Sequence, residues 1–242
     1  MSHDKRKHRG PGPKDHHLFS SEQVIILKNA AKDYCWLLDK DYSAKASLKL
    51  VGDKFKLQER QRKALDRCNQ PHSLAEPIRQ KEIKQPDSIK NQIVIIDGFN
   101  LLIILESALS GAPLFKGRDS LIRDISGLHG SYRKINETPQ AIELVADFFK
   151  IYQPSQVFWI FDRPVSNSGR LANLVAEIGR KAGIRWSTSL EDQTDSKIAQ
   201  ADGIVISSDS QILFQCKNWF NLSAFLIENK VSERWMIDLW NP

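Results

Sequence analysis

The chain has 242 residues, 41% of them hydrophobic, and a formal net charge of +6. This length allows one large domain or two small ones, and the three isolated cysteines support neither a disulfide framework nor a cysteine-based zinc site. The apolar runs are too short for a transmembrane helix and the charged N-terminus does not resemble a signal peptide, so we expect a cytoplasmic protein without a membrane partner.

The charge is divided unevenly along the chain. Residues 1–92 hold 20 Lys and Arg against 12 Asp and Glu, which leaves 15 against 17 for residues 93–242. A basic N-terminal part of this kind favours a polyanionic partner. The first 18 residues are rich in Gly, Pro, His and charge, and we expect them to form a flexible basic arm.

Helical periodicity follows over residues 19–68. The segment SSEQ at 20–23 has the form of a capping box, and the apolar spacing after it predicts a helix over 21–39. Two further helices are predicted over 42–50 and 57–67. These segments together predict a small, basic, all-α domain.

The third of these helices carries a basic stripe. Arg60, Lys63 and Arg67 recur at helical spacing, and such a stripe is either an ordinary solvated face or a surface that contacts phosphates. We include these three residues among the candidate nucleic-acid-binding residues. The next segment, 69–92, has three prolines and no sustained periodicity, and is predicted to be a linker.

From residue 93 onward, predicted strands and helices alternate. The predicted strands cover 93–97, 157–162, 184–189, 203–209 and, as a short fifth strand, 222–227. The predicted helices cover 101–109, 139–151, 169–182, 194–201 and 211–217, and residues 110–136 are expected to be rich in loops. Alternation of this kind predicts an α/β domain over 93–242, with a parallel sheet and helices on both of its faces.

Aspartates follow three of these strands. Asp97, Asp162 and Asp209 come at strand ends, and Asp195 lies near a helix N-terminus after the remaining strand. Parallel strands bring their carboxyl ends to one edge of the sheet, so we expect all four side chains at this edge. Aspartates also end strands and cap helices for ordinary structural reasons, but four at one edge favour a functional site.

A cluster of this kind calls for a cation. Two unpaired carboxylates about 4 Å apart repel each other by roughly 4 kcal/mol at an effective dielectric constant near 20. Oxygen ligands without His or Cys suit Mg²⁺ or Mn²⁺, and such ions can orient a water for attack on a phosphodiester. The pattern therefore predicts a metal-dependent nuclease with Asp97, Asp162, Asp195 and Asp209 as catalytic residues.

Short motifs around these aspartates resemble the PIN-like and NYN ribonucleases. IIDGFNLL, with Asp97, resembles the first strand of that fold, and IFD at 160–162 resembles its second strand in bacterial NYN enzymes. QTDSKIAQA and ISSDSQIL, with Asp195 and Asp209, are similar to its later part. The resemblance covers roughly 93–220 and implies a PIN-like, Rossmann-like parallel sheet.

The resemblance also implies roles for individual residues. Asp97, Asp195 and Asp209 would bind the metal, with Asn100 and Ser208 in supporting positions, and Asp162 would be a nearby or water-mediated ligand. PIN domains often place another acid between the first two strands. The candidates for this acid are Glu106, Asp119, Asp124 and Glu143, of which we prefer Asp124. The number of metal ions stays open.

The full layout is similar to a poorly characterised prokaryotic family. In that family a basic helical module precedes a PIN-like domain, and HRGPGPKDHHLF and LVGDKFKLQERQRKALDR match the module. This similarity implies no particular activity.

The loop RPVSNSGR at 163–170 is a second candidate for nucleic-acid contacts. Arg163, Asn167, Ser168 and Arg170 lie before or at a predicted helix N-terminus, where backbone N–H groups can bind a phosphate. The alternative is that Ser168 simply caps the helix.

The sequence thus predicts a divalent-metal-dependent nuclease, a hydrolase that acts on RNA in preference to DNA. The alternative is a non-catalytic nucleic-acid-binding protein that retains the fold. A phosphatase of the haloacid dehalogenase type is disfavoured, because Phe99 stands where that chemistry requires an aspartate.

Overall fold

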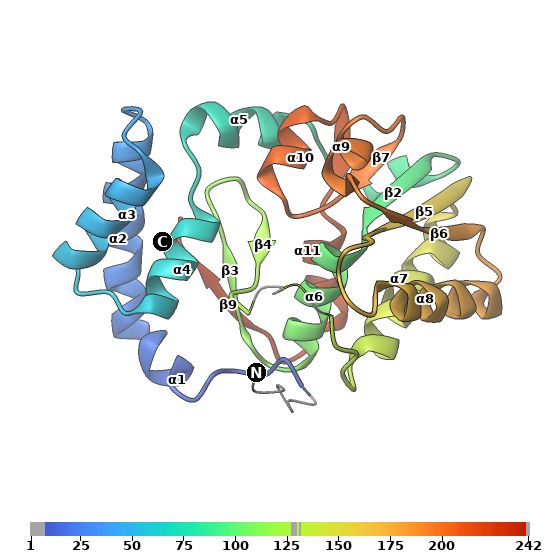
Figure 1. Cartoon of the computed structure of the whole chain (residues 1–242), viewed down its shortest axis with the longest axis horizontal. Coiled ribbons are helices and arrows are strands. Elements are labelled where there is room, and N and C mark those ends of the chain that lie inside the picture. The colour runs from blue at the N-terminus through green and yellow to red at the C-terminus, as the bar shows by residue number, and fades with distance from the viewer. Residues whose placement is uncertain (1–7, 127–129, 131, 241–242) are drawn as a thin grey trace.

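The structure is a computed structural model and describes residues 8–126, 130 and 132–240. A group of helices from the N-terminal part lies at one end of the molecule, a large sheet with its helices lies at the other, and a small sheet lies between them (Figure 1).

The helices are α1 (Asp15–Leu18), α2 (Ser21–Leu38), α3 (Ala44–Lys54), α4 (Glu59–Cys68), α5 (His72–Gln80), the 3₁₀-helix η1 (Pro86–Ile89), α6 (Gly98–Leu109), α7 (Thr138–Tyr152), α8 (Ser168–Ala182), α9 (Thr194–Ala199), α10 (Ser210–Gln215) and α11 (Leu222–Lys230). The strands are β1 (Glu82–Ile83), β2 (Ile93–Asp97), β3 (Pro113–Lys116), β4 (Ile122–Arg123), β5 (Gln156–Asp162), β6 (Trp186–Glu191), β7 (Ile204–Ile206), β8 (Asn218–Phe220) and β9 (Trp235–Asp238).

The large sheet confirms the predicted α/β fold. Its strand order is β1-β8-β7-β2-β5-β6, and every neighbouring pair is parallel. The chain continues from β2 to β5 and β6 on one side, and then crosses to β7 and β8 on the other. Ligands of open α/β sheets bind at such a reversal of strand order, beyond the carboxyl ends of the strands. Here that point lies between β2 and β7.

Two apolar layers cover the sheet. On one face, α6, α7, α8 and α11 pack on strand residues such as Ile96, Trp159 and Phe161. On the other face, α5, α9 and α10 pack on residues such as Ile95 and Val205. Because the central strands β2 and β7 are buried on both faces, their sequences are continuous apolar runs instead of alternating ones.

Most predicted elements occur within a few residues of their expected bounds, but the predicted fifth strand is wrong. Residues 222–227 belong to the helix α11 and not to a strand, with Asn221 accepting a hydrogen bond from the backbone N–H of Ala224 as its cap. The segment 110–136 contains β3 and β4. In the N-terminal part, α3 continues through Gly52 to Lys54, beyond the predicted end at residue 50.

The segment 69–92 is not a linker. It forms α5, β1 and η1, and β1 is an edge strand of the large sheet that pairs with β8. The indole N–H of Trp219 donates to the carbonyl of Ile78 at 2.7 Å, so α5 is attached to the sheet by a buried hydrogen bond as well as by apolar packing.

The helices of the N-terminal part, α1–α4, are called the helical module below. Their apolar side chains share one core with Phe115, Ile125, Ile237 and Leu239, which belong to the small sheet β4-β3-β9 or follow its strands. In this sheet β3 pairs in parallel with β9, although 119 residues separate Lys116 from Trp235. The helical module therefore completes its core with residues that we had assigned to the α/β domain.

Residues 8–18 pack against the body of the protein, which corrects the expectation of a flexible arm over this range. Buried Asp15 accepts two hydrogen bonds from the guanidinium group of Arg60, at 2.6 and 2.7 Å. Arg9 pairs with buried Glu106 at 2.6 Å, and the ring of His16 stacks on Trp235. The rest of the predicted arm, residues 1–7, lies outside the described residues.

Gly98 allows the start of α6 to pack closely against the sheet. A Cβ atom at this position would lie 2.2 Å from Cε1 of Phe161, which is fully buried. We expect Gly98→Ala to lower the free energy of unfolding by about 1–3 kcal/mol, because neither side chain has room to move. Chemical denaturation measures this change. Gly169→Ala is the control, because its Cβ would come no closer than 3.8 Å to Leu190, and should leave stability unchanged or slightly higher.

Candidate carboxylate site

Asp97 ends β2 and begins α6, at the centre of the large sheet. Its Oδ1 accepts a hydrogen bond from the backbone N–H of Asn100 at 3.3 Å, so the aspartate caps α6. Its Oδ2 accepts hydrogen bonds from the side-chain amide of Asn100 and, at 2.8 Å, from the hydroxyl of Ser207. The carboxylate is only 3% exposed, and these bonds hold it in one orientation.

Asp209 occupies the corresponding position after β7. Its Oδ1 caps α10 by accepting hydrogen bonds from the backbone N–H groups of Gln211, at 2.7 Å, and Ile212, at 3.3 Å. The hydroxyl of Ser207 also accepts a hydrogen bond from the backbone N–H of Asp209 at 3.1 Å. Ser207 thus connects the two capping aspartates.

The other two aspartates have fewer constraints. Asp162 is the last residue of β5 and is half-buried, whereas Asp195 lies in the first turn of α9 and is exposed. No side-chain hydrogen bond from the described residues restrains either carboxylate. Both carboxylates are therefore available to a ligand.

A pocket of about 140 Å³ opens at this edge of the sheet, and we call it the carboxylate pocket. The polar residues of its wall are Arg67, Asp97, Asn100, Asp124, Asp162 and Asp195. Asp209 does not line it. Asp209 belongs instead to an adjoining cleft, which shares Arg67 and Asn100 with the carboxylate pocket. The structure thus brings three of the four predicted catalytic aspartates to one pocket and places the fourth next to it.

These aspartates influence one another electrostatically. Burial raises the pKa of Asp97 to about 6, the hydrogen bonds from Asn100 and Ser207 oppose this rise, and the charge of Asp162 adds to it. The pKa of Asp195 is also raised, first by burial and then by the charges of Asp209 and Asp162. Across the described ranges, none of the four forms an ion pair with Lys or Arg.

A Mg²⁺ or Mn²⁺ ion in the carboxylate pocket would need water or a phosphate to supply some of its ligands. Within the part of the chain that the structure describes, no three His, Cys, Asp or Glu side chains are grouped closely enough to hold a metal ion by themselves. Mg²⁺ commonly binds through one or two carboxylates, keeps several waters and takes further ligands from phosphates. The oxygen donors and the mutual repulsion of the aspartates suit such an ion, with Asp97, Asp162 and Asp195 as the side chains that would hold it.

Of the four acids considered for the additional position, only Asp124 lines the carboxylate pocket. Asp119 is fully buried and engaged by Arg123 through two hydrogen bonds. Glu106 is buried in a separate network with Arg9, Tyr132 and Thr138. Glu143 lies exposed on α7, and its side chain lines neither the pocket nor the adjoining cleft.

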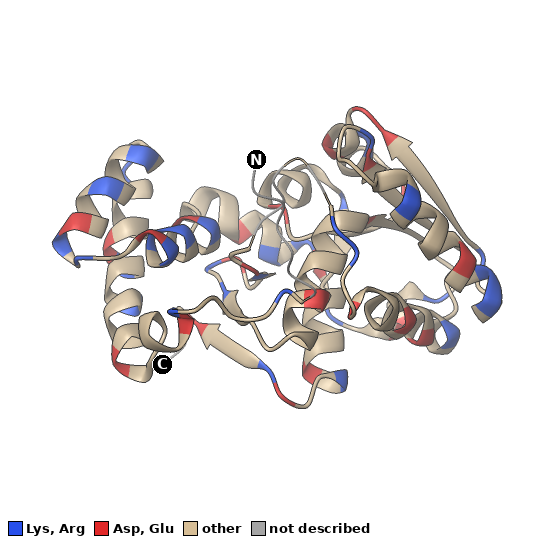
Figure 2. Cartoon of the chain, turned by 60° about the horizontal axis from the view of Figure 1, so that its bottom comes forward, with Lys and Arg blue, Asp and Glu red and all other residues tan. Residues whose placement is uncertain are grey.

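The predicted basic stripe of α4 faces the protein more than the solvent. Arg60 is engaged by Asp15, and the ammonium group of Lys63 donates to the carbonyl of Ser126 at 3.2 Å. Arg67 lies 3.6 Å from Asp124 and is the one member of the stripe that reaches the carboxylate pocket. Basic and acidic bands alternate on the helical module in Figure 2, so its surface is not uniformly positive.

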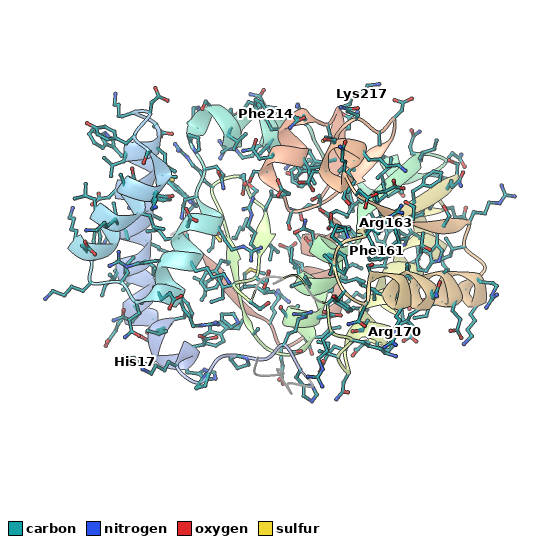
Figure 3. All side chains as sticks on the ribbon, in the orientation of Figure 1. His17, Phe161, Arg163, Arg170, Phe214 and Lys217 are labelled. Atoms are coloured by element: carbon teal, nitrogen blue, oxygen red, sulfur yellow. The ribbon has the colours of Figure 1, made fainter. Side chains whose placement is uncertain are left out.

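In the loop at 163–170, the structure contradicts the alternative that Ser168 caps the helix. Ser168 does not cap α8, because its hydroxyl donates to the carbonyl of Arg163, and Asn167 precedes the helix in a left-handed conformation with its amide bonded to the carbonyl of Tyr132. Arg163 donates to the carbonyl of Leu190. Figure 3 shows Arg163 and Arg170 in the half of the molecule away from the helical module, and neither lines the carboxylate pocket.

Ser207 is the functional residue that sequence reasoning missed. The hydroxyl of Ser208, which we had selected, donates to Asn100 at 3.3 Å, whereas that of Ser207 contacts Asp97 directly. A signal was present in the segment ISSD, because two serines precede Asp209 there and Ser207 is the one next to the apolar residues of the predicted strand.

Comparisons with known proteins identify the family. A family model described as Domain of unknown function (DUF5616) matches residues 86–225, which is more than half of the chain. The chain belongs to this family. The DUF5616 segment contains all four strand-end and helix-start aspartates, while a second model, Protein of unknown function (DUF434), matches residues 26–81 of the helical part and includes Arg67.

A relative that matches most of the chain is found in an archaeon. An uncharacterized protein of Methanocaldococcus jannaschii is 29% identical over 191 residues, which cover 78% of this chain and 89% of the relative. No solved structure matches the chain. Among the helices of the described residues, none has the length and apolar character needed to cross a membrane.

Proposed function

We propose that this protein is a divalent-metal-dependent nuclease of the PIN-like/NYN type that hydrolyses phosphodiester bonds, with RNA preferred over DNA. The observation that carries the proposal is the convergence of Asp97, Asp162 and Asp195 on one pocket, beside Asp209, at the reversal of strand order in the sheet. Three free, buried cysteines are compatible with a reducing compartment, and we place the protein in the cytoplasm.

The site residues divide into fixed and free groups. Asp97 is held by Asn100 and Ser207, so it can position a ligand without losing side-chain entropy. Asp162 and Asp195 are unrestrained and can adjust to a ligand and its waters. When bound, Mg²⁺ or Mn²⁺ supplies an acidified water and stabilises charge that develops on the phosphoryl oxygens. Arg67, at the rim of the same pocket, can hold a non-bridging phosphate oxygen.

A non-catalytic nucleic-acid-binding protein with this fold is the second candidate. The observation that favours it is the absence, among the described residues, of three acids grouped closely enough to bind a metal ion. In that case the carboxylates would remain apart when nucleic acid binds.

The two functions are separated by a cleavage assay. Labelled single-stranded RNA and DNA are incubated with the protein and Mg²⁺, Mn²⁺ or EDTA. If the protein is a nuclease, it cleaves only with the metal, and Asp162→Asn and Asp195→Asn abolish this cleavage. Asp202→Asn is the matched control, because Asp202 is an exposed aspartate that pairs with Lys217. Binding without cleavage under all of these conditions establishes the second candidate instead.

A further inference from the structure

The adjoining cleft is lined by residues of α2, α4 and α10 and by the segment after β7. Its volume is about 350 Å³, within the range of about 300–1,000 Å³ that is typical of small-ligand sites. One wall comes from the helical module and the segment that follows it, and the opposite wall comes from the α/β part. The first wall includes Tyr34, Asp66, Asn69 and Gln70, and the second includes Asn100, Asp209 and Gln211.

The cleft and the carboxylate pocket adjoin each other. Arg67 and Asn100 line both cavities, so a ligand in the cleft can extend past these two side chains to the aspartates. The ion pair of Arg67 with Asp124 is loose, at 3.6 Å, and the Arg67 side chain is 30% exposed. The guanidinium group has five N–H donors, so it can donate to a phosphate oxygen while its contact with buried Asp124 is kept.

Most polar side chains of the cleft already have partners. The hydroxyl of Tyr34 donates to Asp66 at 2.8 Å, and both amide atoms of Asn69 are used, by the carbonyl of Leu65 and the indole of Trp240. These bonds give the module side of the cleft a fixed shape.

Two amides of the cleft differ from the rest. Throughout the residues that the structure describes, the side chains of Gln70 and Gln211 have no hydrogen-bond partner, although both line the cleft. Gln70 follows α4 of the helical module, and Gln211 belongs to α10. A primary amide offers both donors and an acceptor, which is the combination that the hydrogen-bonding edge of a nucleobase requires.

We propose that this cleft is a nucleotide subsite, in which the base contacts Gln70 and Gln211 and the attached phosphate lies at Arg67, at the entrance to the carboxylate pocket. The subsite deepens the proposed function and rests on it, because it defines the substrate as a single strand whose unpaired base can enter a cavity. Asp66 and Asp209 line the cleft as well, and Arg123, which also lines it, is already engaged by Asp119, so the charges inside the cleft do not favour a phosphate away from Arg67. An uncharged base is therefore the part of the ligand that fits there.

The test measures binding separately from cleavage. All variants are made in the Asp97→Asn protein and measured in EDTA, so that the RNA is not cleaved. The Kd is measured from the fluorescence anisotropy of a fluorescein-labelled single-stranded RNA of six nucleotides. We expect Gln70→Ala combined with Gln211→Ala to raise the Kd at least tenfold. Gln140→Ala, an exposed glutamine on α7 outside both cavities, should leave the Kd unchanged. If the double variant is poorly folded, Gln211→Glu alone, at an exposed position, is expected to produce a similar loss.

Competition identifies which part of the ligand the cleft binds. Nucleoside 5′-monophosphates should displace the labelled RNA, whereas inorganic phosphate at the same concentration should not. Displacement by both alike would show that only a phosphate site exists and would overturn the proposal.

The outcomes for the subsite and for the nuclease are distinct. A Kd within twofold of the background in the double variant and in Gln211→Glu overturns the subsite, even if the wild-type protein cleaves RNA. A tenfold loss of binding supports the subsite, even if the wild type cleaves nothing with Mg²⁺ or Mn²⁺, a result that would refute the nuclease alone.

Discussion

Asp97→Asn is expected to lower metal-dependent cleavage strongly and to stabilise the protein at the same time. The carboxylate is buried, and its pKa is raised from 3.8 to about 6 because burial outweighs the hydrogen bonds from Asn100 and Ser207. At about 1.4 kcal/mol for each pKa unit, the ionised side chain destabilises the folded state by about 3 kcal/mol at neutral pH. Asparagine removes this charge and with it the ability to attract a cation.

The net gain in stability should be smaller than this figure. Asparagine retains only part of the hydrogen bonding with Asn100 and Ser207, so we expect about 1–2 kcal/mol, or a few degrees in Tm. Activity should fall on the order of 10³-fold. Chemical denaturation in EDTA measures the first effect, and the cleavage assay with labelled RNA measures the second. Asp202→Asn, at the surface, should change neither.

The pH dependence of this stability difference has a defined sign. Because the pKa of Asp97 is higher in the folded state, the folded protein binds the proton more tightly. The contribution of Asp97 to the stability of the wild type therefore falls as pH rises from 3.8 to about 6. The variant lacks this contribution. Its advantage should therefore grow across this window and stay constant above it. A variant that is less stable than wild type at pH 7 would show that the folded state favours the charged form.

Asp119→Ala should cause one of the largest losses of stability among single substitutions in this chain. Asp119 accepts hydrogen bonds at 2.8 and 2.6 Å from the Arg123 guanidinium group, and both side chains are buried. Removing the carboxylate leaves a buried cation without its anion, which costs about 3–5 kcal/mol. At about 2–4 °C in Tm for each kcal/mol, thermal unfolding should occur on the order of 10 °C lower.

This loss should extend to the carboxylate site. Arg123 also donates to the carbonyl of Ser208 at 3.2 Å and to the hydroxyl of Ser210 at 2.8 Å, so the ion pair supports the turn that presents Asp209. The combined replacement of Asp119 by Ala and Arg123 by Met should recover part of the stability, because no buried charge remains. Asp147→Ala, which breaks an exposed pair with Lys150, should cost less than about 1 kcal/mol. Equal effects of the buried and the exposed substitution would contradict this account.

The sequence was sufficient to predict the α/β class, the strands β2, β5, β6 and β7, and most of their helices. These predictions rest on local patterns, since an apolar run that ends in an aspartate is visible without knowledge of its neighbours. It was also sufficient to predict that Asp97, Asp162 and Asp195 lie at one edge of the sheet, because strands that run parallel end on the same side of their sheet.

Other features depend on pairings between distant residues. The two-residue strand β1 exists only because β8 lies beside it, and β3 because β9 returns to it from the C-terminal part. The short apolar run at 222–227 has no decisive period, so packing against α6 and α7 selected the helix. The same limit explains why the segment 69–92 was taken for a linker.

What the sequence by itself determined is which chemical groups stand at the ends of the central strands, because strand direction and hydrophobic pattern are encoded locally. Only the tertiary structure decided which of those groups share a cavity. It placed Asp209 in the adjoining cleft, engaged Asp119 and Glu106 elsewhere, and brought Arg67 of the helical module to the pocket. Those choices depend on the relative positions of helices that are far apart along the chain, and no local pattern encodes these positions.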